Sequence, residues 1–104
     1  MRNITETPER WVILKVLNGY KVYGTWAGGY LDSDSWKLNS GITQVEQDDD
    51  YYYFTGYSGS CYKCHKKGYG VMTSYGQGVL NNILDTGEGF IELLDDQDWT
   101  ILKL

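Results

Sequence analysis

The chain has 104 residues, 22% of them charged, and a net charge of −5, which allow one domain with one modest core. It carries ten Tyr, four Trp and two Phe beside thirteen Gly and a single Pro. This composition is typical of short twisted strands joined by tight turns, and it excludes a disordered chain. With only nine basic residues, the chain is poorly suited to a partner held mainly through its phosphates.

The sequence also bears on compartment. No apolar run approaches the roughly 18 residues of a membrane span, so we expect no membrane partner. Residues 1–10 lack the apolar stretch of a secretory signal. We therefore expect a cytoplasmic protein whose two cysteines are thiols rather than a structural disulfide.

The first predicted elements form a β-hairpin. Residues 11–17 are β-branched and apolar, and they end at Asn18-Gly19, the dipeptide that best tolerates the positive φ angles of a tight hairpin turn. Residues 20–26 return as the second strand, with Gly24 marking a bend or bulge. Before the hairpin, Pro8 predicts one short turn of helix at most.

The remaining elements are also predicted from local composition. Residues 27–35 read as a loop, 36–46 as a third strand interrupted near Gly41, and 48–50 as a solvated acidic turn rather than a metal loop. A fourth strand begins at residues 51–55 and continues toward Tyr62, with residues 69–75 as its partner. Residues 79–84 fit either a strand or one helical turn, and residues 90–94 and 99–104 predict a second hairpin.

Together these elements predict an all-β fold, a small and strongly bent barrel. We expect a single domain over residues 1–104, with the barrel at about residues 11–80 and a C-terminal β-hairpin extension at about residues 81–104.

The stretch Cys61-Tyr-Lys-Cys64-His65 matches the spacing of a c-type haem attachment box. Haem is disfavoured because no export signal is present and the surroundings read as β-structure. A structural zinc site needs four donors, and Cys61, Cys64 and His65 supply three. A redox pair needs a helix N-terminus that the sequence does not suggest. The favoured interpretation is two cysteines packed as weak hydrophobes in a strand, followed by turn residues.

No arrangement for catalysis is visible either. The chain has one histidine, with no Ser or Asp in a pattern that would make it a general base. We therefore expect a non-enzymatic protein without a cofactor.

Residues 14–46 resemble the Sm and Sm-like (LSm) family. The shared features, in order, are an apolar strand with an Asn-Gly hairpin, a strand with a Gly at position 24, a loop with Asp, the pair Leu38-Asn39, and an apolar strand ending in Glu46. The loop is longer than the family's usual one, and Ser35 occupies the family's Asp spacing, with Asp34 and Asp32 just upstream. The second family motif is weaker, because Tyr75 stands where the family has Arg, before Gly76.

The resemblance implies a five-stranded bent barrel that joins edge to edge with copies of itself into a homo-oligomeric ring. It also implies single-stranded RNA bound at the inner rim. By this resemblance Asn39 would contact a base, Asp34 would orient it, and Trp36 or Lys37 would take the stacking position. Tyr75 would replace the Arg beside Gly76.

Two alternatives stay open. The acidic balance, the missing Arg and the surplus of Tyr favour a structural or protein-interaction module that has lost RNA binding. A small metal-binding protein using Cys61, Cys64 and His65 is the third hypothesis.

Overall fold

The computed structural model describes residues 3–28 and 34–104, so Asp32 lies outside the described residues. Within these ranges the chain forms seven strands, one α-helix and one short 3-10 helix. The strands are β1 (Arg10–Val16), β2 (Gly19–Trp26), β3 (Ser35–Leu38), β4 (Ile42–Gln47), β5 (Tyr51–Gly56), β6 (Cys61–His65) and β7 (Glu92–Leu93). The helix is α1 (Ser74–Thr86), and the 3-10 helix is η1 (Trp99–Ile101).

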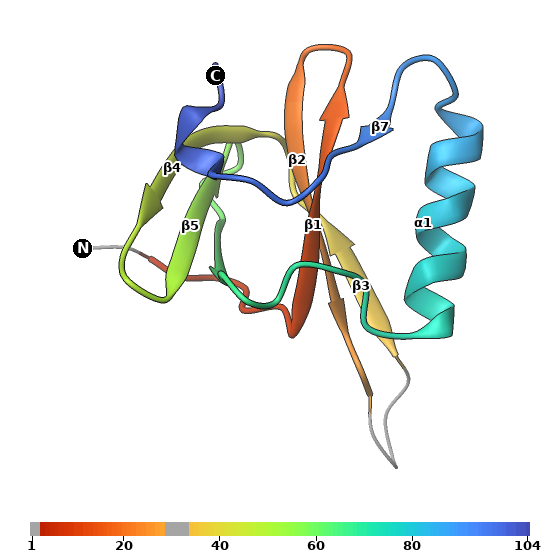
Figure 1. Ribbon diagram of the computed structural model, residues 1–104, viewed down its shortest axis with the longest axis horizontal. Helices are drawn as coiled ribbons and strands as arrows, with labels where there is room; N and C mark the ends of the chain where they lie inside the picture. The colour runs from red at the N-terminus through yellow and green to blue at the C-terminus, as the bar shows by residue number, and fades with distance from the viewer. Residues whose placement is uncertain (1–2, 29–33) are drawn as a thin grey trace.

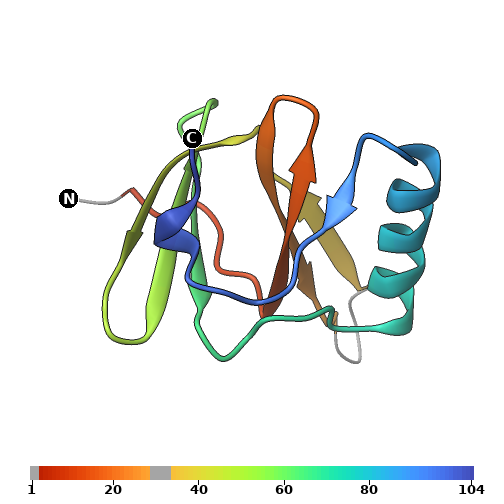
Figure 2. The same ribbon diagram turned by 45° about the horizontal axis from the view of Figure 1, so that its top comes forward.

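The strands are arranged in two antiparallel sheets, ordered β3-β2-β1-β7 and β4-β5-β6. Helix α1 lies on one side of the first sheet and the second sheet lies on the other (Figure 1 and Figure 2). The fold is therefore mostly β, as expected, with one helix that is longer than the single turn allowed for residues 79–84.

The β1–β2 hairpin is confirmed. Its ladder runs without a break from Arg10↔Thr25 to Val16↔Gly19, and Gly19 has a φ of 153°, a conformation that favours glycine. The ladder contains no bulge at Gly24. A Cβ at this position would lie 2.9 Å from the Cβ of Pro8. Gly24 therefore lets the N-terminal segment pack directly onto β2.

We expect Gly24→Ala to lower the free energy of unfolding by about 1–3 kcal/mol, because the added methyl group forces Pro8 away from β2. Gly78→Ala is the matched control, since Gly78 lies on the exposed side of α1 with nothing within 4 Å of its added Cβ. That change should stabilise the protein by about 0.5–1 kcal/mol. Urea unfolding of both variants measures the difference, and equal effects of the two changes would contradict this packing at Gly24.

The predicted third strand is interrupted where expected, and the interruption separates the two sheets. Strand β3 pairs with β2, whereas β4 pairs with β5. Between them Gly41 has a φ of 129°, and the ring of Tyr57 lies so close that a Cβ on Gly41 would meet it at 2.9 Å. The chain thus crosses from one sheet to the other at a bend that only glycine fits.

The expected helical turn before Trp11 is wrong. Residues 3–9 contain no helix, and the segment instead runs along the edge of β6. The backbone N–H of Thr5 donates to Cys61 O at 2.9 Å, and that of Lys63 donates to Glu6 O at 2.9 Å. A sheet edge satisfies these backbone groups better than one isolated helical turn, which is costly to nucleate.

The expected strand at residues 69–75 is also wrong. Tyr69 makes only an isolated bridge to Trp11, and α1 begins at Ser74. The side chain of Thr73 caps the helix by accepting from Gly76 N at 3.0 Å. The buried side of α1 packs on the first sheet through four residues: Val79, Leu80, Ile83 and Leu84.

The predicted C-terminal hairpin does not form. Strand β7 pairs with β1 through Leu14↔Leu93 and Lys15↔Glu92, and residues 99–101 form η1, capped by the Asp98 side chain. Trp99 is fully buried and packs with the core between the sheets. The C-terminal residues therefore complete the same core as the strands.

Two layers of apolar side chains hold these elements together. Between the sheets lies an aromatic core whose buried members are Trp11, Ile13, Val22, Ile42, Tyr52, Phe54, Tyr62, Cys64 and Trp99. Between the first sheet and α1 lies a smaller core with Val12, Leu14, Tyr23 and Leu80 buried. Because neighbouring residues of β1 point to opposite faces, Trp11 and Ile13 join one core while Val12 and Leu14 join the other.

Candidate functional site

The two cysteines of the C-x-x-C-H box point to opposite faces of β6, because they are three positions apart on one strand. Cys64 is fully buried in the aromatic core. Burial raises the pKa of its thiol well above the ordinary range, and the neighbouring Cys61 raises it further. A thiol in this setting is unreactive and packs as a small hydrophobe.

His65 is engaged at the end of the same strand. Its Nδ1 accepts from the backbone N–H of Lys67 at 3.0 Å. Its ring and that of Tyr51 are arranged edge to face, with their centroids 5.0 Å apart. Across residues 3–28 and 34–104, no three His, Cys, Asp or Glu side chains gather in a group that could hold a metal ion. The metal-binding hypothesis at this box gains no support from the geometry.

Asn39, the candidate for base contact, is 3% exposed and holds the bend between β3 and β4 in place. Its Oδ1 accepts from Val22 N at 2.8 Å, and its own backbone N–H donates to Val22 O at 3.0 Å. Its buried Nδ2 has no hydrogen-bond partner among the described residues. The side chain therefore continues the sheet ladder rather than facing solvent.

Two further predicted residues are not gathered around Asn39. The Asp34 carboxylate accepts from Gly28 N at 3.0 Å, at the other end of β3. Lys37 forms an ion pair with Glu6 at 2.8 Å, on the face of β3 away from Trp36. The Asp34 carboxylate is therefore engaged away from Asn39, and the charge of Lys37 is already matched within the chain.

The structure does bring Trp36, Tyr75 and Gly76 together, around Tyr23. The ring of Trp36 lies 5.7 Å from that of Tyr23, and the Tyr23 hydroxyl donates to Gly76 O at 2.7 Å. Burial, with a smaller contribution from Tyr75, raises the pKa of Tyr23 to about 12. Trp36 is 37% exposed and Tyr75 52%. Two accessible aromatic side chains thus flank one buried tyrosine beside the start of α1.

Three of the four most exposed large apolar side chains in the described part of the chain lie elsewhere, and the fourth, Ile101, is in η1. Leu17 and Tyr57 are each 75% exposed, and Phe90 is 65% exposed. They come from the β1–β2 turn, the β5–β6 turn and the loop between α1 and β7, which share one end of the molecule, at the top of Figure 1. We call this surface, defined by Leu17, Tyr57 and Phe90, the apolar end. This surface was not predicted from the sequence, because its three residues lie in segments that are far apart in the chain.

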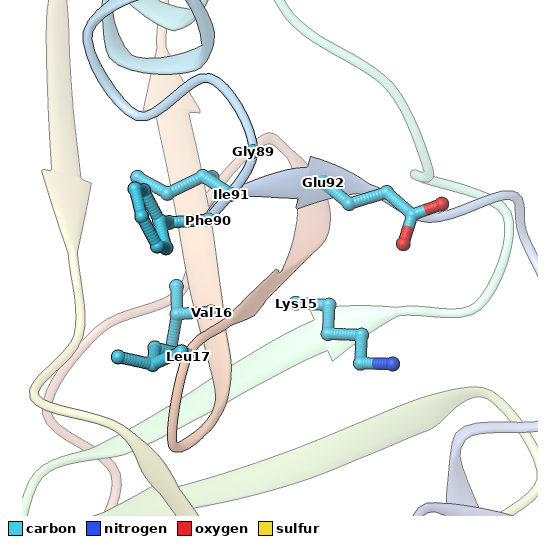
Figure 3. Close-up of a pocket in the computed structure, with 7 residues that line it drawn as sticks. All are labelled: Lys15, Val16, Leu17, Gly89, Phe90, Ile91 and Glu92. Carbon is cyan, nitrogen blue, oxygen red and sulfur yellow. The ribbon is translucent and has the colours of Figure 1, made fainter.

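Two hollows flank Leu17 at the apolar end. The larger, about 470 Å³, lies between the β1–β2 turn and residues 89–92. Figure 3 shows Val16 and Leu17 facing Phe90 across this hollow, with Lys15 and Glu92 pointing away on the other side. The smaller, about 320 Å³, lies between Leu17 and Tyr57. The apolar end is therefore a row of three projecting side chains with a hollow on each side of the central one.

Charged side chains of both signs line the hollows of the apolar end. Lys15 and Glu92 line the larger hollow, and Lys21 lines the smaller one. The acidic triplet at residues 48–50 lies in the β4–β5 turn. This turn is at the end of the second sheet opposite to the β5–β6 turn (Figure 1). In a chain with a net charge of −5, this end therefore carries no excess of negative side chains that would repel another acidic molecule.

Two negative findings complete the description of the chain. Among the described residues, no helix has the length and apolar character needed to cross a membrane. Comparisons with protein-family models, with curated proteins and with solved structures return no match. The functional assignment therefore depends on the geometry of the chain itself.

Proposed function

We propose that this chain is a non-enzymatic protein-interaction module that assembles with copies of itself. The observation that carries the proposal is the apolar end, where three large apolar side chains, each at least 65% exposed, stand beside two hollows. Exposed apolar surface of this kind marks protein contacts, and Tyr and Phe are enriched there. The titratable side chains that line these hollows are Lys15, Glu92, Tyr20, Lys21 and Tyr57.

An Sm-like architecture is part of the proposal. It is supported by the bent segment β3–β4, which passes from one sheet to the other between β2 and β5. The five-stranded barrel of that family remains an expectation, since the strands described here form two sheets.

The homo-oligomeric ring also stays a prediction. Edge-to-edge assembly needs strands with unpaired outer edges. Thr5 and Glu6 occupy the outer edge of β6, while β3 and β4 stand at the ends of their sheets. The two-residue strand β7 also ends the first sheet, so any contact between sheet edges would use β3, β4 or β7 rather than β6.

Single-stranded RNA binding is the second candidate function, favoured by the exposed pair Trp36 and Tyr75. Aromatic side chains stack on bases without regard to sequence. The burial of Asn39 and the ion pair of Lys37 with Glu6 remove two of the groups that would read or attract RNA. For this reason protein contact is the leading proposal.

The proposed self-assembly is tested by the solution mass of the purified protein. Light scattering across a range of concentrations should give a mass that rises above the 11.9 kDa of one chain without any nucleic acid. A parallel series with an oligo-U RNA at low salt tests the second candidate. A single-chain mass at every concentration would contradict self-assembly, and association only in the presence of RNA would favour the second candidate.

A further inference from the structure

We infer that the apolar end is a two-fold contact in which Leu17 of one copy enters the hollow between Leu17 and Phe90 of a second copy. This inference rests on the proposed self-assembly and adds the surface, the partner and the symmetry. The occupant is a second copy of this chain.

The shape of the surface argues for a second copy. Leu17 projects, with 75% of its surface exposed, and the hollow of about 470 Å³ begins directly beside it. In Figure 3 the side chains of Leu17 and Phe90 point in the same direction, with Val16 drawn between them as part of the lining of the hollow. One surface thus carries both the projecting group and the space that receives it. A two-fold contact requires this combination, because each copy presents the same patch.

The charges agree with the same arrangement. Two chains that each carry −5 repel one another unless they meet where the local charge is small. The rim of the larger hollow has one residue of each sign, Lys15 and Glu92. When two copies meet across a two-fold axis, each charged residue on this rim can face a residue of opposite charge on the other copy as readily as one of like charge. A strongly basic partner would be drawn to the acidic residues 48–50 instead.

The position of the apolar end determines which other surfaces remain free after the contact forms. It is formed by two turns and a loop, so a contact there leaves the backbone edges of β3 and β4 unused. A two-fold contact closes on itself and gives a dimer. Contacts through the sheet edges would then be needed for any larger assembly.

Leu17→Asp is the direct test, with the dissociation constant of self-association as the readout. Leu17 lies in a turn outside both cores, so the fold should survive, and circular dichroism checks this. A two-fold contact contains Leu17 twice, once from each copy. Replacing both leucines should therefore weaken association by about a hundredfold. Tyr75→Asp is the matched control, because Tyr75 is 52% exposed and lies at the start of α1, away from the apolar end (Figure 1).

Leu17→Cys provides a second readout that depends on geometry rather than affinity. Mild oxidation should join two copies through Cys at position 17, because the two-fold axis brings these positions together. The native cysteines are both buried and should not compete, and Tyr75→Cys should give no such product. If the wild-type protein associates but Leu17→Asp associates equally well and Leu17→Cys is not cross-linked, this inference fails while self-assembly stands. If the wild-type protein remains a single chain, both fail.

Discussion

Trp11→Ala should have the largest effect on stability, lowering the free energy of unfolding by about 3–5 kcal/mol. Trp11 is fully buried, and its ring meets aromatic neighbours from three parts of the chain at centroid distances of 4.9–6.2 Å. These neighbours are Tyr52, Phe54, Tyr69 and Trp99. Its Nε1 also donates to His65 O at 2.8 Å. The substitution opens a cavity where both sheets and the C-terminal segment meet. A domain of this size has only about 5–15 kcal/mol of total stability, so partial unfolding at room temperature is expected.

A matched pair separates the hydrogen bond from the cavity. Trp11 and Trp99 are both fully buried, but Nε1 of Trp99 has no hydrogen-bond partner among the described residues. Trp11→Phe should therefore cost about 1 kcal/mol more than Trp99→Phe. Urea unfolding followed by circular dichroism measures all three variants. A loss below about 1 kcal/mol for Trp11→Ala would show that Trp11 is not the centre of the core.

The first half of the fold was predictable because its signals are local. The Asn18-Gly19 turn sets the register of the hairpin, and Gly41 marks the crossing between sheets. These features depend on residues a few positions apart. The predicted single strand from residue 51 toward Tyr62 is wrong beyond residue 56, because the chain turns there and residues 61–65 pair back on residues 51–55 as β6.

The second half was not predictable in the same way. The sequence Ser74-Tyr-Gly-Gln-Gly-Val79 contains two glycines in the first turns of α1, and glycine is a poor helix former. The helix exists because Leu80 fits against Val12, Leu14 and Tyr23 on the first sheet. Likewise Trp99 turns into the core instead of forming a strand. Both outcomes depend on contacts distant in sequence, which local propensity does not report.

The candidate functional residues show the same difference between what local sequence indicates and what only the fold brings together. The resemblance to Sm-like proteins selected six residues, and three of them, Trp36, Tyr75 and Gly76, do meet around Tyr23. The other three are Asp34, Lys37 and Asn39, which are engaged elsewhere. The apolar end combines two turns and a loop that are remote in sequence. A single exposed Leu or Phe in a sequence carries no signal, because such residues are common on protein surfaces. Their proximity becomes visible only in the fold.

Asn39→Ala is the substitution that decides what Asn39 does. We expect it to lower the free energy of unfolding by about 1–3 kcal/mol, because the buried backbone N–H of Val22 loses the acceptor that Asn39 Oδ1 supplies at 2.8 Å. Removing Nδ2 should cost no hydrogen bond, since that atom has no partner among the described residues. The substitution should also loosen the bend that joins the two sheets, since Asn39 N donates to Val22 O in the same place.

The control for this change is Asn82→Ala, on the exposed side of α1. It should be neutral or slightly stabilising, because alanine is the better helix former. Thermal unfolding of both variants should be measured together with oligo-U binding. If Asn39→Ala left the stability unchanged and abolished oligo-U binding, Asn39 would be a recognition residue rather than a structural one. Loss of stability with no RNA binding in the wild-type protein would instead place Asn39 in the scaffold that supports the apolar end.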